Sequence, residues 1–110
     1  MCIFCKIAAG ELGTAFLYED ENVLAFRDLD PQAPTHILVI PRSHYENVEE
    51  LASAEPLTLA SLFRVASDLA DLEGLDGHRT LFNTGVSAGQ SVFHAHLHMM
   101  GGRPLAWPPG

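Results

Sequence analysis

The sequence predicts an α+β fold in which an antiparallel sheet of about five strands packs against one long helix and a short N-terminal helix. Short runs of apolar and β-branched residues alternate with turn-forming residues, which is typical of strands joined by short connections. One longer segment, residues 55–73, repeats its apolar residues at the helical period and is bounded by Pro56 and Gly74. The 110 residues, of which 47% are hydrophobic, fit one domain spanning residues 1–110.

The elements can be placed from local pattern. Residues 3–9 predict a short helix because apolar residues recur at 3, 4, 7 and 8 and Gly10 follows. Asp20-Glu21-Asn22 indicates a hairpin turn, whereas the two prolines of residues 30–34 interrupt regular structure. Five apolar runs are predicted as strands: residues 15–19, 23–27, 36–40, 79–83 and 92–100.

The long helix carries more apolar residues than one stripe needs. The predicted core-facing stripe consists of Leu59, Leu62, Phe63, Ala66, Leu69 and Ala70. Three further apolar residues fall partly off it: Leu57, Val65 and Leu72. They indicate either a wide buried face or a second surface that contacts another subunit.

Charge and composition exclude some partners. The formal net charge is −8, and the six Lys and Arg residues are scattered. This distribution argues against binding to nucleic acid or to an anionic membrane surface, both of which require clustered basic residues. There is no basic segment followed by a long apolar run, and no stretch long enough to cross a bilayer, so we expect a cytoplasmic protein.

Residues 91–100, SVFHAHLHMM, place His94, His96 and His98 at alternate positions. On a strand these side chains share one face, while Ala95, Leu97 and Met99 point the other way, toward the helix. The histidines could be a solvated polar face, metal ligands or phosphate-binding groups; three in register weaken the first interpretation. Residues i and i+4 of a strand are about 13 Å apart, so one metal ion can take at most one or two of them.

Phosphate chemistry suits this run because neutral imidazole is a nucleophile and imidazolium stabilises phosphoryl oxygens. The preceding loop, residues 85–91, adds glycine backbone N–H groups and a hydroxyl, which suit an anion. The pair Cys2-x-x-Cys5 could be two exposed thiols, a redox pair or half of a zinc site. Redox motifs of this spacing usually follow a strand in a βαβ unit, which is absent here, and spacing alone nominates no further zinc ligands.

The histidine run resembles a known family. His94-Ala95-His96-Leu97-His98-Met99-Met100 matches the pattern His-φ-His-φ-His-φ-φ, where φ is apolar. Together with LAFRD at 24–28, PTHILVIP at 34–41, GQSV at 89–92 and WPPG at 107–110, it resembles the Hint branch of the histidine triad (HIT) superfamily along essentially the whole chain. The resemblance implies a HIT-like fold and a two-fold dimer, with helix 55–73 and the last sheet edge pairing across the axis.

The resemblance also implies an activity, the hydrolysis of purine nucleoside 5′-phosphoramidates through a nucleotidyl-histidine intermediate, without a catalytic cofactor. His98, where the nucleotidyltransferase branch has glutamine, favours hydrolysis. His96 would be the nucleophile, and His98 would contact the phosphate and assist the leaving amine. Ser91 and Gln90 would bind phosphate oxygens or orient the leaving group, and His36 would support the site.

The substrate implied is a purine nucleotide, an AMP or GMP derivative. Asp28 would accept hydrogen bonds from the ribose hydroxyls, and Trp107, beside the partner's active site, could shape the leaving-group pocket. The complete nucleotide-binding set implied is Ile3, Phe4, Ile7, Phe26, Asp28, Leu29, Asn83, Gly89, Gln90, Ser91, Val92, His96, His98 and Trp107. Of these, Ile3, Phe4, Ile7, Phe26 and Leu29 would form the apolar slot for the base.

Some bacterial Hint-like proteins pair the cysteine motif with the equivalents of His44 and His94 around zinc. The resemblance therefore implies a structural zinc held by Cys2, Cys5, His44 and His94. Two other functions stay open from sequence: hydrolysis of dinucleoside polyphosphates, for which the GQSV and WPPG segments are the wrong markers, and a nucleotide-binding scaffold that regulates partners with little turnover.

Overall fold

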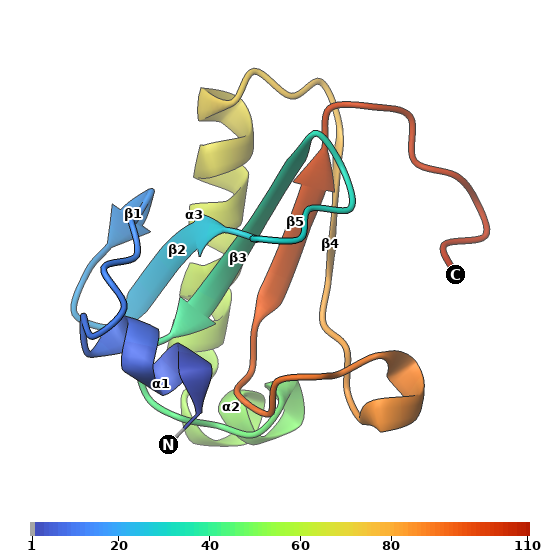
Figure 1. The fold of residues 1–110 in the computed structure, drawn as a ribbon. Helices are drawn as coiled ribbons and strands as arrows, with labels where there is room; N and C mark the ends of the chain where they lie inside the picture. Colours follow the sequence, from blue (N-terminus) through green and yellow to red (C-terminus); the bar gives the residue numbers. More distant parts are fainter. Residues whose placement is uncertain (1) are drawn as a thin grey trace.

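The computed structural model, which describes residues 2–110, has the α+β architecture that the sequence predicts (Figure 1). Its strands form one antiparallel sheet in the order β1-β2-β3-β5-β4. The helices are α1 (Ile3–Ala8), α2 (Val48–Ala54) and α3 (Pro56–Leu72), with a 3-10 turn η1 (Val86–Ala88). The strands are β1 (Tyr18–Glu19), β2 (Val23–Arg27), β3 (Thr35–Pro41), β4 (His78–Leu81) and β5 (Leu97–Gly101).

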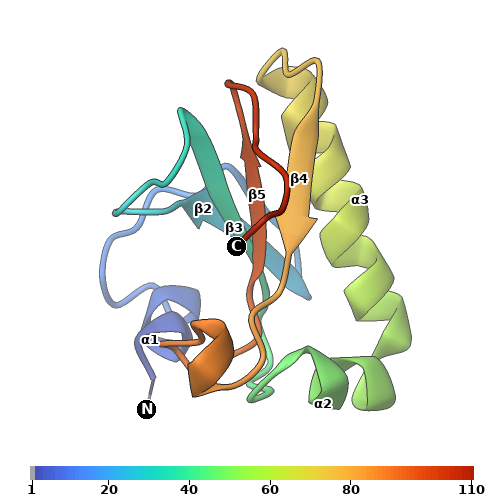
Figure 2. The ribbon, with the colours of Figure 1, turned by 90° about the vertical axis from the view of Figure 1, so that its right-hand side faces the viewer.

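The two faces of the sheet are covered by different elements. Figure 2 shows α3 along one face and α1, η1 and the C-terminal tail on the other. Because alternate residues of a strand point to opposite faces, the buried run of β2 divides between the two cores. Val23 and Ala25 join the α3 core, and Leu24 and Phe26 join the core that contains Phe4 of α1.

Helix α3 matches the predicted boundaries to within one residue, with Pro56 in its first turn. Leu62, Ala66, Leu69 and Ala70 are buried as expected, and Leu59 is partly buried against the same core. One prediction for this helix was wrong: Phe63, expected in the core-facing stripe, is 44% exposed. Val65, which falls partly off that stripe, is buried, as a wider buried face requires, because the buried face is rotated toward Thr58 and Val65.

The sequence did not predict helix α2, which ends directly before α3. It is short, and Leu51 is its one buried residue, so it carries no apolar period to detect. Asn47 caps it, with the side-chain oxygen accepting the backbone N–H of Glu50 at 3.0 Å.

The last strand begins five residues later than predicted. Residues 92–96 are not paired in the sheet, and β5 starts at Leu97. The backbone groups here bond elsewhere: Ala95 N–H donates to the carbonyl of Tyr45 at 2.7 Å. The shorter β5 also shortens its neighbour β4, because Leu81 already pairs with His98. Likewise β1 covers two residues of the predicted 15–19, since Phe16 packs against the α1 core.

Candidate functional site

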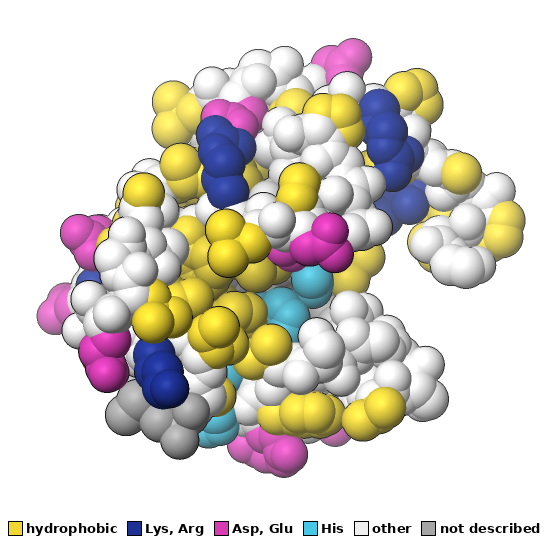
Figure 3. Space-filling view, in the orientation of Figure 1, with side chains coloured by type: hydrophobic (Ala, Val, Ile, Leu, Met, Phe, Trp, Pro, Cys, Tyr) yellow, Lys and Arg dark blue, Asp and Glu magenta, His cyan; other side chains and the backbone are white. Residues whose placement is uncertain are grey.

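The three histidines belong to residues 91–100, a segment that lies on the side of the sheet that α1 and η1 cover (Figure 2). As predicted, Ala95, Leu97 and Met99 point into the α3 core. His94 and His96 are buried although they precede the strand, and His98 is partly buried on β5. Figure 3 shows histidine side chains in a hollow that apolar side chains border. Each of the three rings has a different hydrogen-bond partner and therefore a different chemical capability.

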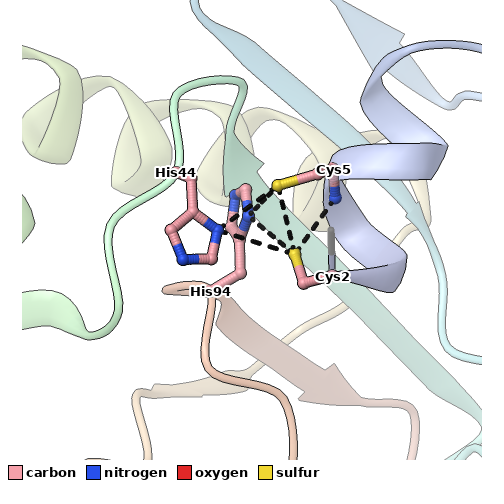
Figure 4. Close-up of side chains that lie close together, drawn as sticks. All are labelled: Cys2, Cys5, His44 and His94. Carbon is pink, nitrogen blue, oxygen red and sulfur yellow. Dashed lines mark hydrogen bonds between the residues drawn. The ribbon is translucent and has the colours of Figure 1, made fainter.

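His94 belongs to a cluster with Cys2, Cys5 and His44, whose side chains converge in Figure 4. The Cys2 Sγ lies 3.6 Å from His44 Nδ1 and 3.4 Å from His94 Nδ1, and the Cys5 Sγ lies 3.3 and 3.6 Å from the same atoms. A tetrahedral zinc holds sulfur and nitrogen ligands about 3.5 Å apart, given bonds of about 2.3 and 2.0 Å. The four residues therefore form a possible zinc site.

The positions of the two sulfur atoms and of the His94 ring are consistent with zinc binding. The two Sγ atoms are 3.2 Å apart, too far for a disulfide, whose S–S bond is about 2.05 Å, and slightly closer than the about 3.8 Å expected across a zinc ion. His94 is 0% exposed, and its Nε2 lies 2.8 Å from the carbonyl of Pro41. Because a carbonyl only accepts, His94 Nε2 carries the proton, and the Nδ1 lone pair points at the sulfurs.

His96 is held in the tautomer that a nucleophile requires. Its Nδ1 lies 2.8 Å from the backbone carbonyl of His94, so Nδ1 carries the proton and Nε2 keeps a free lone pair. The ring packs edge-on against Phe4, with centroids 5.0 Å apart. The ring of His98 is 4.8 Å away, centroid to centroid.

A chain of hydrogen bonds holds His98 in the opposite tautomer, with the proton on Nε2. The backbone N–H of Gln32 donates to His36 Nδ1 at 3.0 Å, so the proton of a neutral His36 is on Nε2. That N–H donates to His98 Nδ1 at 2.9 Å, which leaves the proton of His98 on its Nε2. Within residues 2–110, His98 Nε2 is the one buried side-chain nitrogen or oxygen without a hydrogen-bond partner. Such an orphaned donor indicates a missing acceptor.

Burial sets the ionisation of this group. It lowers the pKa of His36, against the opposing effect of Asp28 and Asp30, and it lowers the pKa of His94 and His96. The pKa of His98 falls to about 4, first through burial and then through the neighbouring imidazoles of His96 and His36. The free protein thus holds neutral imidazoles at neutral pH.

A cavity of about 710 Å³ opens beside His96 and His98, a size that fits a mononucleotide. Ten of the fourteen residues expected to bind nucleotide line it: Ile3, Phe4, Ile7, Phe26, Asp28, Leu29, Ser91, Val92, His96 and His98. The cavity also has lining residues that the sequence analysis missed: Leu12, Gly13, Thr14, Ala15, Leu17, Arg27 and Leu38. Most of them belong to the loop before β1, where no motif or period marks them.

The other four expected residues lie elsewhere. Gln90 is buried, and its side chain holds loop 85–92 together: Oε1 accepts from Gly85 N–H, and Nε2 donates to the carbonyls of Glu46 and Val92. Asn83 lines a second cavity and lies near Gly89. Trp107, in the tail, is 82% exposed.

Comparison with known proteins establishes the family. The family model of the HIT domain matches residues 9–105. The purine nucleoside phosphoramidase of Escherichia coli K12 is 43% identical over 105 residues, which cover 94% of this chain and 88% of that protein. A 14 kDa zinc-binding protein of Zea mays is 50% identical over 112 residues, with 98% and 87% coverage. The crystal structure of a HIT family hydrolase from Legionella pneumophila superposes with a TM-score of 0.95 at 46% identity, covering all of both chains.

This chain belongs to the HIT domain family. The expected resemblance is therefore confirmed, and so is the expected fold. Between residues 2 and 110, no helix is both long enough and apolar enough to cross a membrane.

The cluster of Cys2, Cys5, His44 and His94 predicts one tightly bound zinc ion per chain. Elemental analysis of protein purified without added metal is the measurement. The double substitution of Cys2 and Cys5 by serine should abolish the zinc, whereas His78→Asn, which alters an exposed histidine outside the cluster, should keep it. Chelation should lower the melting temperature, because the ion stabilises the folded chain alone. A folded protein that purifies without zinc would contradict the prediction.

The depressed pKa of His98 predicts a loss of stability in acid. An unfolded histidine titrates near 6.5, and His98 in the folded chain titrates at about 4, so the unfolded state binds more protons between these values. The free energy of unfolding should therefore fall as the pH drops from about 6.5 toward 4. Urea unfolding of the native protein and of His98→Asn isolates this group, since both keep the same four metal-ligand candidates. Equal pH slopes for the two proteins would contradict it.

Proposed function

We propose that this protein is a hydrolase that cleaves the P–N bond of purine nucleoside 5′-phosphoramidates through a nucleotidyl-histidine intermediate. The observation that carries the proposal is the pair of imidazoles with opposite tautomers at the 710 Å³ cavity. His96 offers a lone pair at Nε2, and His98 offers a proton at Nε2. Cleavage of a phosphoramidate needs one of each, a nucleophile and an acid.

In the first step, His96 Nε2 attacks the α-phosphorus and forms a P–Nε2 bond as the P–N bond to the amine breaks. The carbonyl of His94 holds Nδ1–H, which orients the ring and stabilises the positive charge that develops on the imidazole. Water then attacks phosphorus, the P–Nε2 bond breaks, and the nucleoside monophosphate leaves.

The departing amine must gain a proton, which His98 supplies. Burial keeps His98 neutral in the free protein, but the negative phosphoryl group in the cavity favours its protonated form in the complex. A protonated His98 no longer accepts at Nδ1, and His36 Nε2–H then has a second acceptor in Asp28, whose Oδ2 lies 3.4 Å away. In the second step, His98 takes the proton of the attacking water.

The remaining residues would bind the nucleotide. The apolar wall of Phe4, Ile7 and Phe26 suits a purine ring, and the carboxylate of Asp28 suits the two ribose hydroxyls. Ile3 and Leu29 would border the base at the exposed mouth of the cavity. The Ser91 hydroxyl, with the backbone of Gly89 and Val92, would donate to phosphate oxygens.

Gln90 and Asn83 would act on the shape of the phosphate-binding loop. The amide of Gln90 forms three backbone hydrogen bonds, so we assign it the positioning of loop 85–92. Zinc would be structural, held by Cys2, Cys5, His44 and His94. It would fix α1, which carries Phe4, against the segment that carries His96.

The roles of the triad predict distinct kinetic defects. His96→Ala should lower turnover of adenosine 5′-phosphoramidate by roughly 10³-fold or more while nucleoside monophosphate still binds. His98→Ala should lower it by about 10²-fold and accumulate the nucleotidyl-histidine in a burst. Rapid-quench kinetics measures both. A His96→Ala protein with near-normal rate would contradict the mechanism, and faster hydrolysis of a diadenosine polyphosphate would favour the alternative substrate class.

We further propose a two-fold dimer formed by α3 and the sheet edge. On α3, Leu57 is 83% and Leu72 81% exposed, so the helix leaves apolar side chains uncovered near both of its ends. Strand β4 is the outer strand of the sheet and leaves backbone groups unpaired. Pairing two copies at this edge would cover the exposed leucines of α3 and the unpaired backbone groups of β4. It would also place Trp107 beside the partner's leaving-group pocket.

The dimer predicts that the tail acts between chains. Sedimentation at micromolar concentration should give a dimer, and deleting residues 105–110 should change the ranking of amine leaving groups more than the affinity for nucleoside monophosphate. Mixing the tail-deleted chain with full-length His96→Ala should restore the ranking, because the inactive partner supplies its tail to an intact triad. A monomer in sedimentation, or an unchanged ranking after deletion, would contradict the proposal.

A further inference from the structure

The two cysteines of the chain, Cys2 and Cys5, both belong to the start of α1. Cys2 is the N-cap residue, and its Sγ accepts the backbone N–H of Cys5 at 3.2 Å. Residues three apart are neighbours on a helical turn. The two Sγ atoms lie 3.2 Å apart, so an approach of about 1.2 Å would bring them to the length of a disulfide bond.

The two sulfur atoms can be reached from solvent. Both cysteines are partly exposed, and His44, which contacts them, is exposed, whereas His94 is buried. Helix α1 packs against β2 and β3, while β4, the edge of the proposed dimer, is the outer strand at the other end of the sheet (Figure 1). Pairing at β4 would therefore leave the cysteines open to small oxidants.

The cluster joins three segments that are distant in sequence: the start of α1, His44 after β3 and His94 before β5 (Figure 4). Four ligands to one zinc ion would fasten these segments to one another. A bond between Cys2 and Cys5 would instead join two residues of the same helical turn. It would also take from the buried Nδ1 of His94 the group that its lone pair faces, and an unsatisfied buried acceptor is destabilising.

Helix α1 supplies part of the wall of the nucleotide cavity. Ile3, Phe4 and Ile7 line the cavity, and the Phe4 ring packs edge-on against His94 and His96, with centroids 6.0 and 5.0 Å away. The helix has six residues, too few to be stable without tertiary contacts. Loss of the link at its start should therefore loosen the apolar wall that would hold the base.

We propose that Cys2 and Cys5 form a reversible redox switch, in which hydrogen peroxide converts the two thiolates to a disulfide, zinc is lost and affinity for nucleotide falls. The proposal rests on the proposed function for its consequence, because it names a regulation of the same site.

The oxidation takes two steps. One thiolate attacks the peroxide, the O–O bond breaks, and a sulfenic acid and hydroxide form. The second thiolate attacks the sulfenic sulfur, the S–S bond forms and a second hydroxide leaves. The two sulfurs lose two electrons, the peroxide gains them, and two protons convert the hydroxides to water. His44 and His94 are then the only ligands left, whereas structural zinc takes four.

The test oxidises the native, zinc-loaded protein with hydrogen peroxide and measures its intact mass, the zinc released to a chromogenic chelator and the affinity for AMP. The mass should fall by two hydrogen atoms per chain as zinc is released, and the affinity for AMP should fall by about tenfold. Dithiothreitol with added zinc should restore all three. Methionine oxidation is separated from the switch because it adds an oxygen atom to the mass.

Two controls assign the effect to the cysteines. The double substitution of Cys2 and Cys5 by serine should bind AMP as weakly as the oxidised native protein and should not respond to peroxide. Native protein stripped of zinc while reduced should also bind AMP weakly, and added zinc should restore the affinity only while the thiols stay reduced. This second comparison decides the same point if the serine variant does not fold. His78→Asn, which keeps the cluster, should respond as the native protein does.

Hydrogen exchange separates this inference from the proposed function. The amides of Lys6 and Ala9, which donate to the carbonyls of Cys2 and Cys5, should exchange faster after oxidation, whereas those of α3 should not. Unchanged exchange in α1, unchanged affinity for AMP, or thiols that excess peroxide does not join would each overturn the switch. Absence of phosphoramidate turnover by the reduced native protein would overturn the proposed function, while mass, zinc and exchange would still decide the switch.

Discussion

The hydrogen bond from His96 Nδ1 to the backbone carbonyl of His94, 2.8 Å long, is the interaction on which the rest of the site depends. It forces the free lone pair onto Nε2, at the cavity. It is available because residues 92–96 do not pair in the sheet, so the His94 carbonyl is free to accept a side chain. The same residue directs its own ring at the cysteines, so one residue joins the possible zinc site to the proposed nucleophile.

The segment after β3 also stabilises the position of His94 and His96 through backbone contacts. The backbone carbonyl of Tyr45 accepts the N–H of Ala95, and the carbonyl of Glu46 accepts a hydrogen bond from Gln90 Nε2. Residues 90–95 are therefore tied at both ends to the chain next to His44. The hydroxyl of Tyr45 donates to Glu55 at the start of α3. A few polar contacts thus connect the segment next to His44, a residue of the possible zinc site, with residues 90–95 and with the long helix.

The two faces of the sheet carry different parts of the molecule, one the main apolar core and the other the histidines. Alternation along β2 and β3 lets α3 cover one face with a continuous apolar core, while α1 and the histidines occupy the other. His36 on β3 and Arg79 on β4 flank β5 on this second face, with Met100 between them. The cavity of about 710 Å³ and the second cavity, which Asn83 lines, both include His98, where bond cleavage is proposed.

The sequence by itself determined the fold class, the long helix and the direction in which Ala95, Leu97 and Met99 point, because these follow from apolar period and local turn chemistry. Its motifs also named, by resemblance, ten residues that line the cavity of about 710 Å³. Only the tertiary structure decided which nitrogen carries the proton in His94 and in His98, since that depends on partners distant in sequence, Pro41 for His94 and His36 for His98. It also decided that Gln90 holds a loop, that β5 starts at Leu97 and that Arg79 and Arg103 face one cavity. None of these has a local signal, because each results from contacts that form only when remote segments pack together.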